Sequence, residues 1–102
     1  MTPIVKLVVF TPPSHADQVR EALAIGGAGR IGNYTHCTFS STGWGRFKPQ
    51  EGAHPTIGEV GKLESVEEER IETVCERELL PKVIEEIKKF TRTKRCLLIS
   101  TR

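Results

Sequence analysis

Hydrophobic positions first cluster in Ile4 to Phe10, IVKLVVF, where β-branched residues dominate. A short run of this composition predicts a strand in the interior of a sheet, covered on at least one face. Pro12 and Pro13 end the run, because a proline nitrogen has no hydrogen to donate to a neighbouring strand. The sequence therefore predicts a buried strand followed directly by a turn.

A helical pattern follows the two prolines. Ser14, with Asp17 three residues later, is typical of a helix N-cap. The apolar positions then recur on one helical face, at Ala16, Val19, Ala22 and Leu23. We expect this helix to end near Ile25, because Gly26 and Gly27 supply the left-handed residue that helix C-termini favour.

Two further stretches, Thr35 to Ser41 and Gly43 to Phe47, have the β-branched and aromatic residues that favour strands. The Ser-Thr-Gly sequence where they meet predicts the turn of a hairpin. Phe39 and Phe47 are expected in the core or in an interface. Trp44 is expected at or near the hairpin tip, where it either anchors a partner or packs against a neighbouring loop.

A long segment rich in glycine and proline, Lys48 to Gly61, predicts a loop, and loops of this length usually have a function. Lys62 to Cys75 then predicts a long strand, because its second half alternates along the pleat. The run Glu67 to Arg70 inside it is charged throughout. We expect this half of the strand to project from the sheet or to bend, and its charge protects an edge from unwanted pairing.

The clearest amphipathic pattern is Glu78 to Phe90, which predicts a helix. Its apolar stripe consists of Leu80, Val83, Ile84, Ile87 and Phe90. Pro81 is tolerated only in the first turn, so the helix is expected to begin at about Leu79 or Leu80. Cys96 to Ser100 predicts a short final strand.

This order of elements predicts the ferredoxin-like α+β plan, βαββαβ. Two helices pack on one face of an antiparallel sheet in this plan, and here the second strand is expected to be elaborated into an extra hairpin. The 102 residues suit a single domain, 1–102, with a core of its own. A chain of this size gains stability from burying further surface in an oligomer.

Composition and charge narrow the possible functions. The chain is 37% hydrophobic and 27% charged with a net charge of +2, which is typical of an ordinary globular protein. Three cysteines without a CxxC pair indicate free thiols in a reducing compartment. The apolar N-terminal run is too short for a signal peptide or a membrane span. We therefore expect a cytoplasmic protein with no membrane partner.

The stretch Gly26 to Cys37, GGAGRIGNYTHC, is the strongest candidate for a binding surface. It contains a literal GxGxxG, but a helix precedes it and a strand follows, the reverse of a dinucleotide site. Its glycines leave backbone N–H groups available for an anion beside an arginine. Alternatively, the stretch is a tight turn whose arginine pairs with a carboxylate. The candidate ligand-binding residues are Gly29, Arg30, Gly32, Asn33, Tyr34 and His36.

Metal binding is an alternative, with His36, Cys37 and His54 as candidate ligands for a divalent ion and His15 and Cys75 as further donors. His36 and Cys37 are neighbours in a predicted strand and would point to opposite faces, so a subunit interface would have to complete a site. The sequence shows no convincing catalytic set. A Cys–His pair is the one nucleophile–base combination, and cysteines buried in a sheet are usually inert.

A nucleic-acid interface is a further hypothesis. It rests on Arg30, Arg46, Lys48 and the basic stretch after Glu86, with aromatic residues available to stack on bases. These aromatic residues are Tyr34, Trp44 and Phe47. The near-neutral net charge argues against it, and cations also suit the last turn of an ordinary helix.

The segment GAGRIGNYTHCTFSSTGWGRFKPQEGAHPTIGEVGKLE resembles the signature of the small insert domain of YqfO-type proteins, the Nif-three-like dinuclear-metal-centre family. The family pattern is GAG-x-IGNY-x-x-C-x-F, then G-x-F-x-P, then G-x-x-P-x-IG and G-x-x-E. The match is collinear over about residues 5 to 75. Freestanding bacterial proteins of about this length resemble the insert alone.

The resemblance implies a fold similar to CutA and PII signalling proteins, which assemble as trimers through their sheets. It therefore implies a homo-oligomer, with a trimer favoured, and a small ligand or protein partner. The family's metal ligands lie in the large domain that flanks the insert, so neither the dinuclear site nor hydrolase activity is carried over. The family usually follows its last helix with a His-Pro-Tyr-Glu-Glu-Pro-type segment, whereas Thr91 to Arg102 reads TRTKRCLLISTR.

Overall fold

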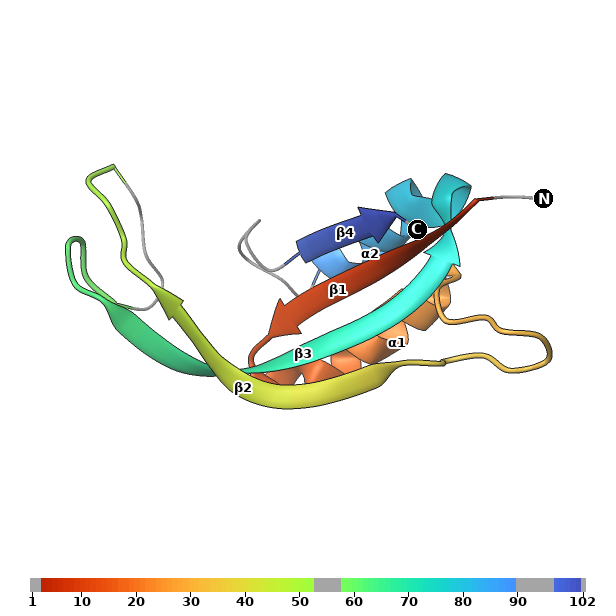
Figure 1. Cartoon of the computed structure of the whole chain (residues 1–102), viewed down its shortest axis with the longest axis horizontal. Helices are drawn as coiled ribbons and strands as arrows, with labels where there is room; N and C mark the ends of the chain where they lie inside the picture. The colour runs from red at the N-terminus through yellow and green to blue at the C-terminus, as the bar shows by residue number, and fades with distance from the viewer. Residues whose placement is uncertain (1–2, 53–57, 90–96, 102) are drawn as a thin grey trace.

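The computed structural model of the chain describes residues 3–52, 58–89 and 97–101. Short 3-10 turns precede the two helices, at Pro13–His15 and Arg77–Leu79. The main elements, in chain order, are β1 (Ile4–Thr11), α1 (Ala16–Gly26), β2 (Phe39–Phe47), β3 (Glu64–Glu76), α2 (Leu80–Lys88) and β4 (Leu97–Thr101). This βαββαβ order, drawn in Figure 1, confirms the predicted ferredoxin-like α+β plan.

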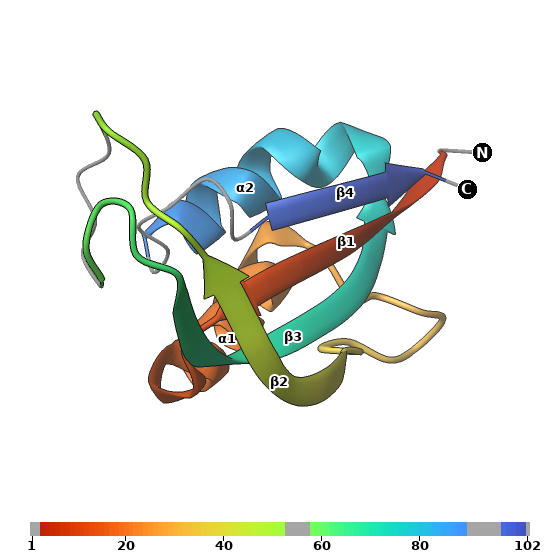
Figure 2. The same ribbon diagram turned by 60° about the vertical axis from the view of Figure 1, so that its left-hand side comes forward.

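The strands form one antiparallel sheet in the order β2-β3-β1-β4. Figure 2 shows β1 between β3 and β4. β1 therefore satisfies its backbone groups on both edges, as its continuous apolar composition predicts. In the register of this sheet, Val5 lies opposite Cys75 and Val9 lies opposite Ile71.

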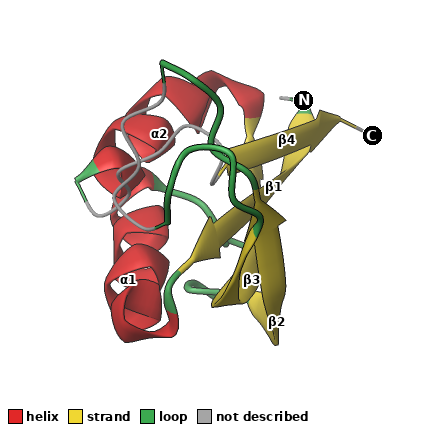
Figure 3. Cartoon of the chain, turned by 90° about the vertical axis from the view of Figure 1, so that its left-hand side faces the viewer, coloured by secondary structure: helices red, strands yellow, loops and turns green. Residues whose placement is uncertain are grey.

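Both helices cover the same face of the sheet, as Figure 3 shows. The side chains of Val5, Leu7 and Val9 point toward the helices and are at most 1% exposed. They pack with residues of α1, β3 and α2 into one core, whose larger members include Val19, Leu23, Ile71, Val83 and Ile87. Among the described residues, no helix is both long enough and apolar enough to cross a membrane.

The two helices approach each other closely at Gly26. A Cβ atom at this position would lie 2.7 Å from the Cα of Val83, so only glycine fits. Gly27 follows in the left-handed conformation, with φ of 104°, and caps the helix as predicted. The predicted N-cap is wrong: Ser14 lies in a 3-10 turn that begins at Pro13, and its hydroxyl contacts the neighbouring His15 instead of a helical N–H.

The predicted hairpin between residues 35 and 47 is also wrong. β2 is one continuous strand that pairs with β3 in an unbroken register, from Phe39 opposite Glu72 to Phe47 opposite Glu64. Gly43 is not among the residues with positive φ, so it does not turn the chain. At Gly45, the carboxylate end of the buried Glu68 side chain lies in the space that a Cβ would occupy.

β2 and β3 continue beyond the rest of the sheet. The pairing of β1 with β3 ends at Thr11 opposite Glu69, whereas β2 accompanies β3 to Glu64. We call residues 43–47 of β2 and 64–68 of β3 the arm. Figure 1 shows the arm extending to the left of the helices, along the 47 Å axis of the molecule. Of the charged run Glu67 to Arg70, the first two residues project as predicted, whereas Glu69 and Arg70 remain paired with β1.

Candidate functional site

The glycine-rich stretch leaves α1 and returns to the sheet through a narrow neck at Gly29. The Gly29 N–H donates to the Val74 carbonyl at 2.8 Å, and the Cys37 N–H donates to the Gly29 carbonyl at 3.0 Å. The hydroxyl of Thr73 donates to the Cys37 carbonyl at 2.8 Å. Gly29 has φ of 79°, and a Cβ there would lie 2.9 Å from backbone atoms of Cys37. The neck thus requires glycine.

Beyond the neck the chain forms an exposed turn, seen at the right of Figure 1. Ile31 and Tyr34 exchange backbone hydrogen bonds of 3.0 and 2.9 Å across Gly32, whose φ is 58°. The side chains of Ile31 and Tyr34 are 54% and 74% exposed. Arg30 and Asn33 are exposed beside them. This turn presents one cation, one amide and two large apolar groups to solvent.

His36 adopts a different geometry from the strand predicted for it. It is the one non-glycine residue of the described chain with positive φ, at 61°. Its Nε2 lies 3.3 Å from the Glu21 carboxylate on α1, and its Nδ1 lies 3.0 Å from the Thr35 hydroxyl. His36 therefore ties the exposed turn to the first helix, and Cys37 precedes β2 instead of lying within it.

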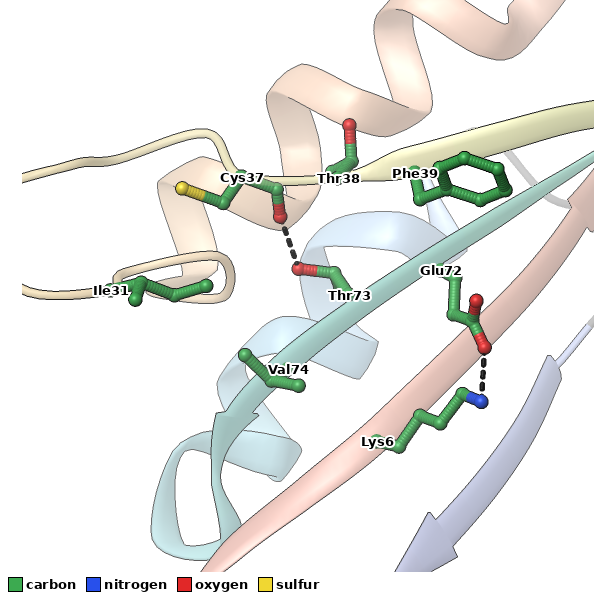
Figure 4. A pocket seen from close by; sticks show the side chains of 8 residues that line it. All are labelled: Lys6, Ile31, Cys37, Thr38, Phe39, Glu72, Thr73 and Val74. Atoms are coloured by element: carbon green, nitrogen blue, oxygen red, sulfur yellow. Dashed lines mark hydrogen bonds and ion pairs between the residues drawn. The ribbon is translucent and has the colours of Figure 1, made fainter.

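A hollow of about 330 Å³ lies where this stretch meets the sheet. Its lining residues are Lys6, Ile31, Cys37, Thr38, Phe39, Glu72, Thr73 and Val74. Figure 4 shows Phe39 and Glu72 side by side on β2 and β3, with the Lys6 ammonium reaching the Glu72 carboxylate from β1. Lys6 and Glu72 alternate with the core residues of their strands, so the hollow opens on the face of the sheet opposite the helices.

Charges at the hollow are already paired. Glu72 accepts hydrogen bonds from Lys6 and, at 3.3 Å, from Arg70. These two bonds, that of Lys6 first, lower the pKa of Glu72 below the ordinary value of a glutamate. The hollow therefore has a compensated ion pair at one side and the apolar side chains of Ile31, Phe39 and Val74 around it.

The predicted ligand-binding residues do not converge on the hollow. Gly29 forms the buried neck, His36 turns toward α1, and the other four, Arg30, Gly32, Asn33 and Tyr34, lie in the exposed turn. The sequence did not single out Lys6, Thr38 and Glu72 as site residues. A lysine inside the apolar run of β1 was the available signal, because a polar residue at one alternating position of a buried strand marks its other face.

The predicted metal ligands are likewise separate. His36 faces Glu21, Cys37 lines the hollow, and His54 lies outside the described residues. Cys75 is buried in the core, where burial, with a smaller contribution from Glu76, raises the pKa of its thiol. Within residues 3–52, 58–89 and 97–101, no group of three or more His, Cys, Asp or Glu side chains is arranged to hold a metal ion.

The basic residues of the nucleic-acid hypothesis are spread along the molecule. Arg30 lies in the exposed turn before β2, whereas Arg46 lies at the other end of β2, in the arm, with Lys48 after it. Trp44 is 70% exposed, as one of its two predicted settings requires, but it lies within β2 and not at a hairpin tip. Phe39 is 65% exposed and so lies outside the core.

Comparison with known sequences places the chain beside longer bacterial proteins. No protein-family profile matches it. It is 64% identical over 69 residues to the "GTP cyclohydrolase 1 type 2 homolog" of Halalkalibacterium halodurans, covering 68% of this chain and 18% of that protein. It is 54% identical over 82 residues to the protein of the same name in Bacillus subtilis, covering 80% of this chain and 22% of the relative. The chain thus spans about a fifth of these relatives' length.

Solved structures agree with the sequence matches. A Bacillus cereus protein related to NIF3 superposes with a TM-score of 0.86 at 44% identity, covering 99% of this chain and 26% of that one. The divalent cation tolerance protein CutA of Archaeoglobus fulgidus has a TM-score of 0.70 at 16% identity, covering 97% and 83%. A B. subtilis GlnK–ATP complex has a TM-score of 0.64 at 14% identity, covering 98% and 83%. The last two similarities support the fold alone.

Proposed function

The chain belongs to the Nif-three-like (YqfO-type) family, and from this premise we propose that it is a non-enzymatic, self-associating module. It matches only about a fifth to a quarter of its relatives' length. We propose that it contributes assembly and binding, through the face of the sheet that the helices leave open and through the exposed turn between α1 and β2.

The open face of the sheet carries the proposal. Phe39, Ile31 and Ile4 are 65%, 54% and 49% exposed on or beside this face, although residues of this type are usually buried. The charged residues between them, Lys6 and Glu72, are paired with each other. Covering this face would remove apolar surface from water without leaving either charge alone, which is the condition that buried charges require.

A second copy of the chain is the occupant that fits this surface best. The fold is shared with CutA and GlnK. Separately, the resemblance to the family's insert domain implies a trimer assembled through its sheets. A chain of 102 residues also has little core of its own to spare, so interface burial adds usefully to its stability. We therefore expect a homo-oligomer, with three copies as the expected number.

The binding half of the proposal concerns the exposed turn. Arg30, Asn33 and Tyr34 present a guanidinium, an amide and a phenol to solvent on a neck that Gly29 fixes to the sheet. Groups of these kinds recognise polar ligands through directional hydrogen bonds. A small ligand or a protein partner would bind here while the sheet face is occupied by the neighbouring copy.

Sedimentation velocity of the wild-type chain and two matched variants tests the assembly. Phe39→Lys places a charge on the open face, and Ile25→Lys places the same charge on α1, at a residue that is 55% exposed. We expect wild type and Ile25→Lys to sediment as the oligomer and Phe39→Lys to shift toward the monomer. Equal sedimentation of the two variants, or a monomeric wild type at micromolar concentration, would reject assembly through this face.

A further inference from the structure

Trp44 is the single tryptophan of the chain, and its side chain is exposed to solvent. It lies in the arm, on an edge strand, with 70% of its surface exposed. Tryptophan is among the residues that dominate protein interfaces when a pocket on the partner receives them. Its placement on a projecting strand therefore raises the question of which surface covers it.

The position of Trp44 on the strand is set by the contacts of α1. Arg20 of α1 donates to the Ser40 hydroxyl at 3.1 Å and pairs with Glu69, which lies opposite Thr42. Ser40 and Thr42 therefore point to the helical side, and Trp44 follows them by the alternation of the strand. Trp44 belongs to the arm, and Figure 1 shows the arm extending beyond the helices.

The hollow of the same molecule is out of reach. Phe39 lines the hollow and faces the opposite side of the sheet, opposite Glu72. Trp44 is five positions further along the same strand, or about 16 Å at the usual rise per residue. One chain therefore carries an exposed anchor and a receiving hollow that it cannot bring together.

The lining of the hollow suits an indole ring. Ile31, Phe39 and Val74 supply apolar and aromatic walls, and the volume of about 330 Å³ falls within the range of pockets that hold small ring systems. The Lys6 ammonium provides a cation for the face of the ring. Glu72 provides carboxylate oxygens that can accept a hydrogen bond from the indole N–H.

We propose that Trp44 of one copy seats in this hollow of the neighbouring copy. The inference rests on the self-association proposed above and names its anchor. Because the two surfaces differ, the contact is head-to-tail, and such contacts close into rings when the rotation between copies permits. Both surfaces carry charges of both signs: Glu67 lies opposite Trp44 and Arg46 follows two residues later, while Lys6 and Glu72 line the hollow. A cation on either surface can therefore face a carboxylate on the other.

Fluorescence of the wild-type chain directly tests whether Trp44 is buried in the hollow of a neighbouring copy, because Trp44 is the only tryptophan. In the assembled protein we expect blue-shifted emission and weak quenching by acrylamide, and dilution to the monomer should shift the emission to the red. Emission typical of an exposed indole from a chain that sedimentation shows to be assembled would overturn the seat and leave the assembly standing. A chain that is monomeric throughout would overturn both.

Cross-linking identifies the receiving hollow. In a Cys96→Ser background, and at a concentration where sedimentation shows the variant to be assembled, Trp44→Cys should form a disulfide between chains with Cys37 of the hollow under mild oxidation, mapped by peptide mass spectrometry. Gln18→Cys, an exposed position on α1, is the matched control and should not form this bond. Equal cross-linking of the two variants, or none for Trp44→Cys, contradicts the proposed contact.

Truncation of the Trp44 side chain measures how much this contact contributes to association. Trp44→Ala should weaken association on the order of 30-fold, as expected for a central aromatic anchor. The same substitution should leave the monomer folded, because the side chain is exposed. An association constant within about threefold of wild type would overturn the role of Trp44 as the anchor.

Discussion

The two faces of the central strand β1 differ although they come from one alternating run of residues. On the helical face Val5, Leu7 and Val9 are at most 1% exposed, in a core completed by α1 and α2. On the other face Lys6 forms an ion pair with Glu72 beside a hollow, and Ile4 is half exposed. The chain covers one face by itself, and in the proposed assembly a further copy would cover the other, so stability and association should respond to different residues.

The largest contrast is expected between Leu7 and Phe39. Leu7→Ala removes a fully buried side chain and should lower the free energy of unfolding by about 3 kcal/mol. Phe39→Ala removes an exposed one and should lower that of the monomer by less than about 0.5 kcal/mol. Urea denaturation at a concentration where the chain is monomeric measures both. Equal losses would contradict the division between the two faces.

The glycine-rich stretch offers a contrast within one loop. Gly29→Ala meets the backbone of Cys37 at 2.9 Å, in addition to the strain of positive φ, and should cost more than about 2 kcal/mol of unfolding free energy. At Gly32 a Cβ has nothing within 4 Å, so alanine there should cost only the left-handed strain of about 1 kcal/mol. Thermal melting of the two variants compares them, and a similar loss in both would mean that the neck is not rigid.

The link between α1 and the sheet should have a smaller effect. Arg20 pairs with Asp17 at 2.6 Å and with Glu69 of β3, and these bonds, that of Asp17 first, raise the pKa of the guanidinium. Arg20→Gln should cost about 1 kcal/mol of unfolding free energy, because both partners keep access to water. Arg30→Gln, in the exposed turn, is the control and should change little. An Arg20 variant as stable as the control would show that the link does not contribute.

The smallest expected effect is on the loss of stability at low pH. The pKa of Glu72 is lowered in the folded protein, so its contribution to stability is present above about pH 4.5 and is lost as the pH falls through the lowered value. Glu72→Gln should therefore reduce the fall in urea midpoint between pH 6 and pH 3. Glu67→Gln, an exposed carboxylate of the arm, is the comparison. A steeper acid loss in Glu72→Gln than in wild type would contradict the sign.

Much of the helical face could be predicted from the sequence because it follows regular periods. The apolar run of β1 and the stripe of α2 place their elements within a few residues, and Gly27 marks the end of α1. Predictions failed where one residue type is common in two kinds of local structure. The sequence at Gly43 predicts a turn although the residue lies in a strand, and Ser14 predicts a cap although a 3-10 turn begins at Pro13.

The open face could not be predicted in the same way, because it depends on pairing between distant residues. Lys6 and Glu72 meet only once β1 and β3 are in register, and Phe39 joins them only because β2 is continuous. The glycines of the exposed turn make it recognisable in the sequence. The orientation of His36 toward Glu21 depends on a positive φ, which no local sequence pattern predicts. The collinear motif shared with the family does not specify these contacts.

Native mass spectrometry of the untagged wild-type chain, purified without chelators, is the most direct test of the claim that the open face is covered by further copies. We predict a dominant species of about three times the 11.4 kDa chain mass. Mass retained beyond that number would identify a ligand or metal for the exposed turn or the subunit interfaces. A species of a single chain at all micromolar concentrations would contradict self-association, and with it the seat proposed for Trp44.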